Sequence, residues 1–249
     1  MAYFNNNLNQ KIAYKYVKRK SPGIIYVHGL NSDMEGTKAI EIEKYAKKNN
    51  LSFLKFDCRG HGKSFGKFED FGISDWKKDL IDLLDNIATG PQIIIGSSMG
   101  GWLMLLAAKA RSKKICGLIG IAAAPDFGKG LYSSLSKKNK KNIKNKGFAK
   151  IITKYGSYKL SKKFFIDANK NIVLHKSFRF KKPIILIHGL KDEVVNSEVP
   201  KKIIKKTSSK NIQIVYIKSG DHQLSKITNI ITIKNAIDNL KNQILFKHS

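Results

Sequence analysis

The sequence predicts an α/β fold whose sheet is mostly parallel and doubly wound, with a lysine-rich insertion. Short apolar runs typical of buried strands, such as IIYVHGL (24–30) and IILIHGL (184–190), alternate with segments of helical apolar spacing. That alternation favours a parallel sheet covered by helices on both faces. The length of 249 residues suits one such domain with a full core. We therefore expect a single α/β domain spanning residues 1–249.

The elements follow from the apolar spacing of each segment. Residues 37–50 have helical periodicity, with Thr37 as the expected N-cap. Residues 51–57 alternate as a strand does, and residues 74–88 form an amphipathic pattern. The expected elements are, in chain order, strand 24–30, helix 37–50, strand 51–57, helix 74–88, strand 91–96, helix 101–110, strand 116–124, strand 184–190, strand 211–217 and helix 227–246.

The pattern breaks over residues 127–182. This segment carries 17 basic residues and one acid, Asp167. It includes SKKNKKNIKNKG, which is too polar to be core. Residues 127–182 are therefore expected to be an insertion into the α/β domain.

The net charge of +29 raises the question of an anionic partner. However, 43 of the 47 basic residues are lysines, whereas specific nucleic-acid recognition relies on arginine. We favour compositional drift, as in an AT-rich genome, and expect no nucleic-acid partner. No apolar run is long enough to cross a membrane, and the N-terminal residues resemble neither a secretory signal nor a transit peptide. The expected location is therefore cytoplasmic, and the source bacterial.

The two cysteines, Cys58 and Cys116, do not suggest a disulfide framework or a metal-ligand cluster. We expect neither a metal nor an organic cofactor.

The stretch IIIGSSMGGWL places two serines between a buried strand and an apolar helix. Only Ser98 is the centre of a G-x-S-x-G pattern, formed by Gly96 and Gly100; centring on Ser97 would put Ile95 and Met99 at the glycine positions. In that pattern the chain turns sharply from strand to helix, and small residues are needed because the backbones crowd. Ser98 is the candidate nucleophile.

A serine nucleophile needs a base, and the base needs an orienting carboxylate. In this architecture the chain order is serine, acid, histidine. Asp192 and His222 each follow a predicted strand in that order, so they are the candidate acid and base. Glu193 and Asp221 compete for the acid role, but Glu193 would face another way. The remaining histidines have the wrong order or context: His28, His61, His175, His188 and His248.

Acyl transfer also requires hydrogen-bond donors for the developing oxyanion. The expected donors are the backbone N–H groups of Met99, which follows the nucleophile, and Leu30, in the loop after an early strand. His28 is expected to hold that loop by a hydrogen bond. In FDCRGHGKS (56–64), Asp57 and Arg59 are expected to brace the site, and Cys58 is expected to be a packing residue.

Together these residues resemble the α/β-hydrolase superfamily. Five stretches are similar to the branch of mitochondrial palmitoyl-protein thioesterases, also described as mycophenolic acid acyl-glucuronide esterases, and to its bacterial relatives: GTKAIEIEKYA, FDCRGHGKS, GPQIIIGSSMGGWLMLLAA, HGLKDEVV and GDHQLS. The resemblance implies Ser98 as nucleophile, Asp192 as acid and His222 as base. It also implies that residues 127–182 form a small cap over the site. Two features depart from the branch: Leu30 replaces a bulkier aromatic residue, and the cap is richer in lysine.

The resulting hypothesis is a serine hydrolase that cleaves acyl esters or thioesters through an acyl-enzyme. Its substrate would be a small acyl donor, which the lysine-rich cap could attract if the donor is anionic or protein-linked. The alternatives are a general carboxylesterase or monoglyceride-type lipase, a peptidase, or a basic binding module on an inactive hydrolase fold. The sequence leaves the oligomeric state and the physiological acyl group open.

Overall fold

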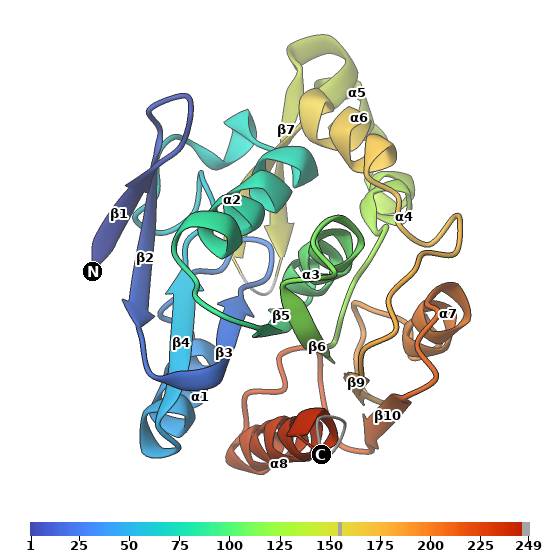
Figure 1. Cartoon of the computed structure of the whole chain (residues 1–249). Helices are drawn as coiled ribbons and strands as arrows, with labels where there is room; N and C mark the ends of the chain where they lie inside the picture. Colours follow the sequence, from blue (N-terminus) through green and yellow to red (C-terminus); the bar gives the residue numbers. More distant parts are fainter. Residues whose placement is uncertain (154–155, 246–249) are drawn as a thin grey trace.

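The structure, a computed structural model, describes residues 1–153 and 156–245. Its main feature is an eight-stranded sheet in the order β1-β2-β4-β3-β5-β6-β9-β10 (Figure 1). The strands are β1 (Ala2–Asn5), β2 (Lys11–Val17), β3 (Lys20–Val27), β4 (Leu51–Phe56), β5 (Gln92–Ser97), β6 (Ile115–Ile121), β7 (Phe148–Thr153), β8 (Gly156–Ser161), β9 (Ile184–Gly189) and β10 (Ile212–Ile217). Strands β7 and β8 form a separate antiparallel pair.

The helices cover both faces of the sheet. They are α1 (Thr37–Lys48), the 3₁₀ turn η1 (Phe68–Asp70), α2 (Ile73–Asn86), α3 (Met99–Ala110), α4 (Gly128–Ser134), α5 (Lys137–Lys146), α6 (Lys162–Lys170), α7 (Val199–Lys206) and α8 (Ile227–Leu245). Apolar residues of α1 and α8 form one core cluster with the sheet, and those of α2 and α3 form the other. The central strands are therefore apolar on both faces, which explains their continuous isoleucine runs.

Neighbouring strands are parallel throughout the part of the sheet ordered β4-β3-β5-β6-β9-β10. The pairs β1–β2 and β2–β4 are antiparallel. Every predicted strand and helix is present, with ends shifted by a few residues. The carboxyl ends of β3, β5, β9 and β10 therefore meet at one edge of the sheet, which is where ligands bind in open α/β sheets.

Helix α2 shows how the sequence builds these elements. Its buried residues, among them Ile73, Trp76 and Leu80, recur at helical spacing, and the Asp75 carboxylate accepts a hydrogen bond from the Gly72 N–H at the N-terminus. The expected cap of α1 is wrong: Gly36 is its N-cap, and Thr37 is already helical. Threonine is acceptable in a first turn, so the pattern located the helix without locating its cap.

The segment 127–182 folds into α4, α5, the β7–β8 hairpin and α6. Despite its polarity, SKKNKKNIKNKG contains helix α5, because Ser136 caps it and Gly147 ends it at φ 81°. Aromatic contacts fasten the segment to the sheet helices: Trp76 lies 6.0 Å from Phe164, and Trp102 lies 5.3 Å from Phe127, between ring centroids.

Candidate active site

Ser98 occupies a strained turn between β5 and α3. Its backbone has φ 51° and ψ −116°, a conformation that costs roughly 1–3 kcal/mol in a non-glycine residue. The crowding explains the flanking glycines: a Cβ on Gly100 would lie 2.2 Å from the Val27 carbonyl oxygen, and one on Gly96 would lie 2.3 Å from the Gly100 oxygen. The Ser98 N–H donates to Ile121 at 2.9 Å and so ties the turn to β6. This geometry half-exposes the Ser98 side chain at the carboxyl edge of the sheet.

His222 and Asp192 complete a hydrogen-bonded chain with Ser98. The Ser98 Oγ lies 3.0 Å from His222 Nε2, and His222 Nδ1 lies 2.8 Å from an Asp192 carboxylate oxygen. His222 lies in the loop after β10, and Asp192 lies in the loop after β9. The order of the strands in the sheet thus brings His222 to Ser98, 124 positions away, and to Asp192, 30 positions away. An ionised Asp192 can only accept, so Nδ1 carries the proton and Nε2 is free to accept the serine proton.

The Asp192 carboxylate is buried and fully bonded. Its other oxygen accepts hydrogen bonds from the backbone N–H groups of Val194 and Val195 at 2.8 and 2.9 Å. Burial raises the pKa of Asp192, but the hydrogen bonds from His222 and from this backbone outweigh it, so the pKa lies below its ordinary value of 3.8. Asp192 is therefore charged at neutral pH.

The competing acids have other partners. Asp221 accepts a hydrogen bond from the Leu224 N–H at 2.9 Å and so shapes its own turn. Glu193 is exposed, and Asp192 is the carboxylate bonded to His222.

The loop after β3 lies directly against Ser98. A Cβ built on Gly29 would be 3.3 Å from Ser98 Cβ, so the backbone next to Leu30 approaches the serine closely. His28 holds this loop as expected: its Nε2 accepts from the Cys58 N–H at 3.0 Å, which leaves Nδ1–H to donate to the Gly29 carbonyl at 2.8 Å. Burial lowers the pKa of His28, which favours this neutral tautomer.

Asp57 and Arg59 brace the neighbouring loop, as predicted. Asp57 accepts hydrogen bonds from the Met34 and Lys63 N–H groups at 2.7 and 2.8 Å. Arg59 forms a buried ion pair with Asp79 at 2.7 Å. Cys58 is buried, and burial raises the pKa of its thiol, so it is a packing residue.

Two positioning contacts carry no sequence motif. His188, at the end of β9, donates from Nε2 to the Val195 carbonyl at 2.9 Å and supports the turn that holds Asp192. Lys38, on α1, donates to the Gln223 carbonyl and to Ser225 Oγ at 3.4 Å, on the loop that carries His222. Both link residues that no local pattern relates; Lys38 and Gln223 are 185 positions apart.

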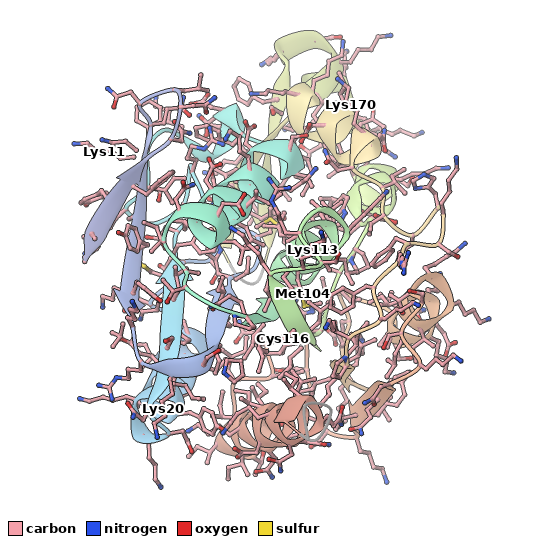
Figure 2. All side chains as sticks on the ribbon, in the orientation of Figure 1. Lys11, Lys20, Met104, Lys113, Cys116 and Lys170 are labelled. Carbon is pink, nitrogen blue, oxygen red and sulfur yellow. The ribbon has the colours of Figure 1, made fainter. Side chains whose placement is uncertain are left out.

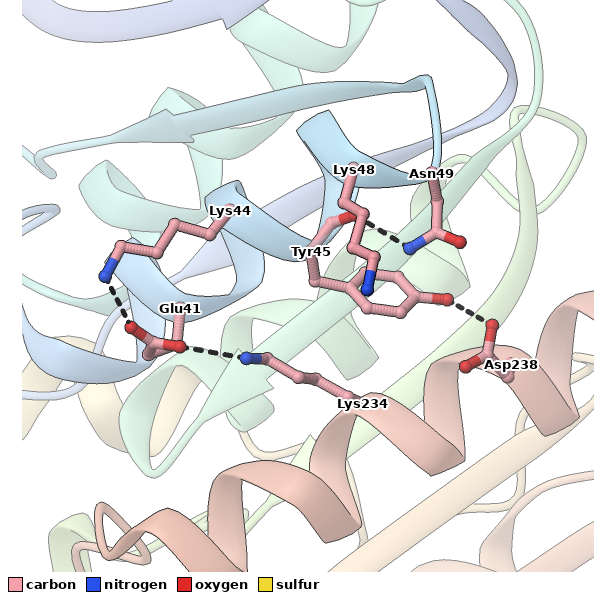
Figure 3. Close-up of a pocket in the computed structure, with 7 residues that line it drawn as sticks. All are labelled: Glu41, Lys44, Tyr45, Lys48, Asn49, Lys234 and Asp238. Atoms are coloured by element: carbon pink, nitrogen blue, oxygen red, sulfur yellow. Dashed lines mark hydrogen bonds and ion pairs between the residues drawn. The ribbon is translucent and has the colours of Figure 1, made fainter.

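Two hollows lie outside the hydrogen-bonded chain of Ser98, His222 and Asp192. A polar pocket of about 410 Å³ opens between α1 and α8, and Figure 3 shows Glu41 between Lys44 and Lys234, and the Tyr45 hydroxyl beside Asp238. Glu41 bonds both Lys44 and Lys234, and the Tyr45 hydroxyl donates to Asp238. A second hollow lies among α4, α5 and α6.

Within residues 1–153 and 156–245, no cluster of three or more His, Cys, Asp or Glu side chains could hold a metal ion. In the same part of the chain, no helix has the length and apolarity needed to cross a membrane.

Comparison with known proteins gives consistent matches. The family described as "Serine aminopeptidase, S33" matches residues 19–172. The mouse protein "Palmitoyl-protein thioesterase ABHD10, mitochondrial" is 35% identical over 96% of this chain and 82% of its own length. The rat protein of the same name is 38% identical over 92% of this chain and 78% of its own length.

Two solved structures are similar over nearly the whole chain. Alpha/beta hydrolase domain-containing protein 10 from mouse has a TM-score of 0.90 at 34% identity and covers 98% of both chains. A putative hydrolase from Agrobacterium vitis S4 has a TM-score of 0.89 at 27% identity and covers 96% of this chain and 97% of its own. These matches confirm the predicted α/β-hydrolase fold and the resemblance to the thioesterase branch.

The expected bacterial, cytoplasmic origin is wrong. The mammalian relatives, which are 35–38% identical to this chain, are named as mitochondrial proteins, and this overturns that expectation. The expectation rested on the composition of the N-terminal residues. Targeting segments are recognised and removed separately from the folded domain. The composition of the folded domain therefore carries no physical trace of the compartment.

Proposed function

The chain belongs to the serine aminopeptidase S33 family, and from this premise we propose that Ser98, His222 and Asp192 are the catalytic triad of an acyl thioesterase and esterase. The enzyme is a serine hydrolase of the esterase and thioesterase class. The observation that carries the residue assignment is the unbroken hydrogen-bonded chain from Ser98 Oγ through both nitrogens of His222 to Asp192.

The reaction follows from the protonation states in that chain. His222 Nε2 takes the proton of Ser98 as Oγ attacks the acyl carbonyl. Asp192 holds the Nδ1–H tautomer and stabilises the imidazolium that forms. His222 then returns the proton to the leaving thiol or alcohol, and the acyl group stays on Ser98. A water molecule, activated by the same histidine, hydrolyses this acyl-enzyme and restores the serine.

The negative charge on the carbonyl oxygen needs fixed donors. We assign these to the backbone N–H groups of Met99 and Leu30. Met99 is the first residue of α3, so its N–H has no partner within the helix. The close approach of Gly29 to Ser98 supports the second donor, because it brings the Leu30 peptide beside the nucleophile. One such donor typically contributes about 10²–10³ in rate.

The substrate class we propose is a long-chain acyl thioester linked to a protein. The support is the name of the relatives, palmitoyl-protein thioesterase. We further propose that residues 127–182 form a cap that shapes acyl selection. A Cβ on Gly156, at the start of β8, would lie 3.4 Å from Asn31 Nδ2, so this hairpin reaches the loop that contains Leu30.

The test is a set of initial rates for wild type and Ser98→Ala. The substrates are matched short- and long-chain acyl thioesters and oxyesters, with an aminoacyl anilide included because of the family description. We expect hydrolysis of thioesters and esters by wild type and loss of all activity in Ser98→Ala, with an unchanged circular dichroism spectrum. A preference for oxyesters would instead favour a general carboxylesterase or monoglyceride-type lipase.

Equal rates in wild type and Ser98→Ala, or no hydrolysis by either protein, would contradict the triad assignment.

The anionic character of the donor has its own test. The rate with an anionic ester should fall with salt more steeply than the rate with a neutral ester, because cap lysines would attract only the former.

A further inference from the structure

The outer side of the cap combines exposed apolar side chains with a cationic rim. The hollow among α4, α5 and α6 has a volume of about 410 Å³. Tyr132, Phe165 and Ile166 are large apolar or aromatic side chains that line it; Tyr132 and Ile166 are 39% and 48% exposed. Its rim carries three exposed lysines: Lys129, Lys144 and Lys162. We call these six residues the cap face.

The positive charge of the protein is concentrated in this segment. Residues 127–182 are 56 of the 249 positions, yet they contribute a net +16 to the total of +29. Compositional drift alone would spread lysines and acids evenly along the chain. Figure 2 shows lysine side chains such as Lys170 projecting from the cap end of the molecule, opposite the end that carries Lys20.

The charges that could neutralise the cap lie on its inner side. Asp167, its one acid, accepts hydrogen bonds from the Ser74 N–H and hydroxyl at 2.7 and 2.6 Å and so faces α2. Lys159 pairs with Glu69 at 3.1 Å, and Lys163 lies 3.9 Å from Asp75. Between the residues that the structure describes, no ion pair involves a rim lysine of the cap face.

We propose that the cap face docks the enzyme on an anionic phospholipid bilayer. The rim lysines would contact lipid headgroups, while Tyr132 and Ile166 would enter the interface between headgroups and acyl chains. The composition favours lipid over a protein partner, because protein interfaces are depleted in lysine and enriched in arginine. Only one arginine, Arg179, lies in the whole segment 127–182.

This docking goes beyond the chemistry at Ser98 and does not depend on it. An acyl chain on a protein partitions into a bilayer, so a membrane-docked thioesterase would meet its substrate there. No single helix carries the signal: the lysines and apolar side chains of the cap face come from α4, α5 and α6, and they converge only in the fold.

The experiment is vesicle co-sedimentation of the full chain. The vesicles are phosphatidylcholine alone, or phosphatidylcholine with about one third phosphatidylserine, at low and high salt. The test variant is Lys129→Gln/Lys144→Gln/Lys162→Gln. The matched control, Lys18→Gln/Lys20→Gln/Lys47→Gln, removes the same charge from exposed positions away from the cap.

Each lysine near an anionic surface contributes about fivefold to partitioning, so the test variant should bind roughly 100-fold more weakly than wild type. The control should bind as wild type does, and neither wild type nor control should bind neutral vesicles. Ile166→Ser should weaken binding severalfold at unchanged charge. The same ordering of wild type, test and control should hold when each carries Ser98→Ala, because docking requires no hydrolysis, which separates this proposal from the catalytic one.

Equal weakening by the test and control variants would overturn the proposal, because net charge and not the cap face would then govern binding. Binding that ignores salt and lipid charge would overturn it too. So would failure to bind anionic vesicles together with retention on an acidic polypeptide such as polyglutamate, because the surface would then suit a protein.

Discussion

Replacing Lys38 with methionine should slow catalysis although Lys38 is not part of the proposed triad. Its ammonium group donates hydrogen bonds to the Gln223 carbonyl and to Ser225 Oγ, and both acceptors lie within three residues of His222. Methionine keeps the length and the apolar stem but removes every donor. The loop that carries the base would then lose its tie to α1.

The size of the effect follows from one charge-assisted hydrogen bond. Such a bond contributes about 1.5–3 kcal/mol, and the half-buried position of Lys38 and the long 3.4 Å contact favour the lower value. A loss of about 1.4 kcal/mol in the alignment of His222 is about a tenfold loss of kcat. KM should change little, because Lys38 bonds the loop and not the acyl donor. Lys38→Arg, which restores donors, should recover most of the rate.

The pH dependence separates positioning from simple stability. Burial lowers the pKa of Lys38 from 10.5 to about 8, with Asp221 opposing the shift. As pH rises through about 8, the ammonium becomes a neutral amine, a weaker donor, and kcat should fall. Between about pH 8 and pH 10.5, Lys38 of the unfolded chain still holds the proton that Lys38 of the folded chain has lost. The contribution of Lys38 to the free energy of unfolding therefore rises with pH, so unfolding cannot explain the lost activity.

The assay is kcat and KM for a soluble thioester from pH 6 to pH 10, beside urea unfolding at each pH. Lys47→Met, at an exposed position in the last turn of the same helix, is the control. A Lys38→Met enzyme with the kcat and the alkaline limb of wild type would refute the reasoning.

Three other single substitutions, and one rescue substitution, test the site and the residues that support it. Asp192→Asn should lower kcat by about 10⁴ while the protein remains folded, because the amide favours the wrong His222 tautomer; a drop below tenfold would contradict the triad. The same variant should lose less stability in acid than wild type does. In wild type, the charged Asp192 contributes stability above pH 3.8, and this contribution is lost as pH falls through the lowered pKa of Asp192. Identical acid unfolding curves for the two proteins would argue against this. Gly100→Ala should destabilise the protein by about 2 kcal/mol or more in urea unfolding, because the new Cβ would lie 2.2 Å from the Val27 oxygen. An unchanged midpoint would mean that the turn at Ser98 has room for this Cβ. Arg59→Met should cost about 3–5 kcal/mol, because Asp79 would be left buried without its 2.7 Å partner, and Asp79→Asn in the same background should recover part of that loss.

The sequence predicted the parallel part of the sheet because isoleucine runs buried on both faces leave few alternatives. It did not predict β1 and β2, the antiparallel edge strands. In KIAYKYV only Ile12 and Ala13 are buried, so the periodicity is too weak to separate a strand from a polar tail. Helix α5 was hidden for a related reason: its ten residues bury only Ile143, and the cap at Ser136 and the terminator at Gly147 define it instead.

The residues of the proposed triad meet because each follows a strand that is recognisable in the sequence, and parallel strands deliver their carboxyl ends to one edge. The groups that fix these residues could not be located in the same way. His188 supports the turn of Asp192 by a hydrogen bond to the Val195 backbone. His28 holds the Leu30 loop by a hydrogen bond from the Cys58 backbone. Lys38 holds the His222 loop by a hydrogen bond to the Gln223 backbone.

Each of these contacts uses a backbone carbonyl or N–H as the partner. A backbone group imposes no residue type on its position, so neither member of the pair leaves a pattern in the chain. The chemistry of the site is therefore encoded in side-chain identity, and its alignment is encoded in topology. Substitutions at Lys38, His188 and His28 should consequently lower kcat while the motifs remain intact, an outcome that inspection of the motifs alone would not anticipate.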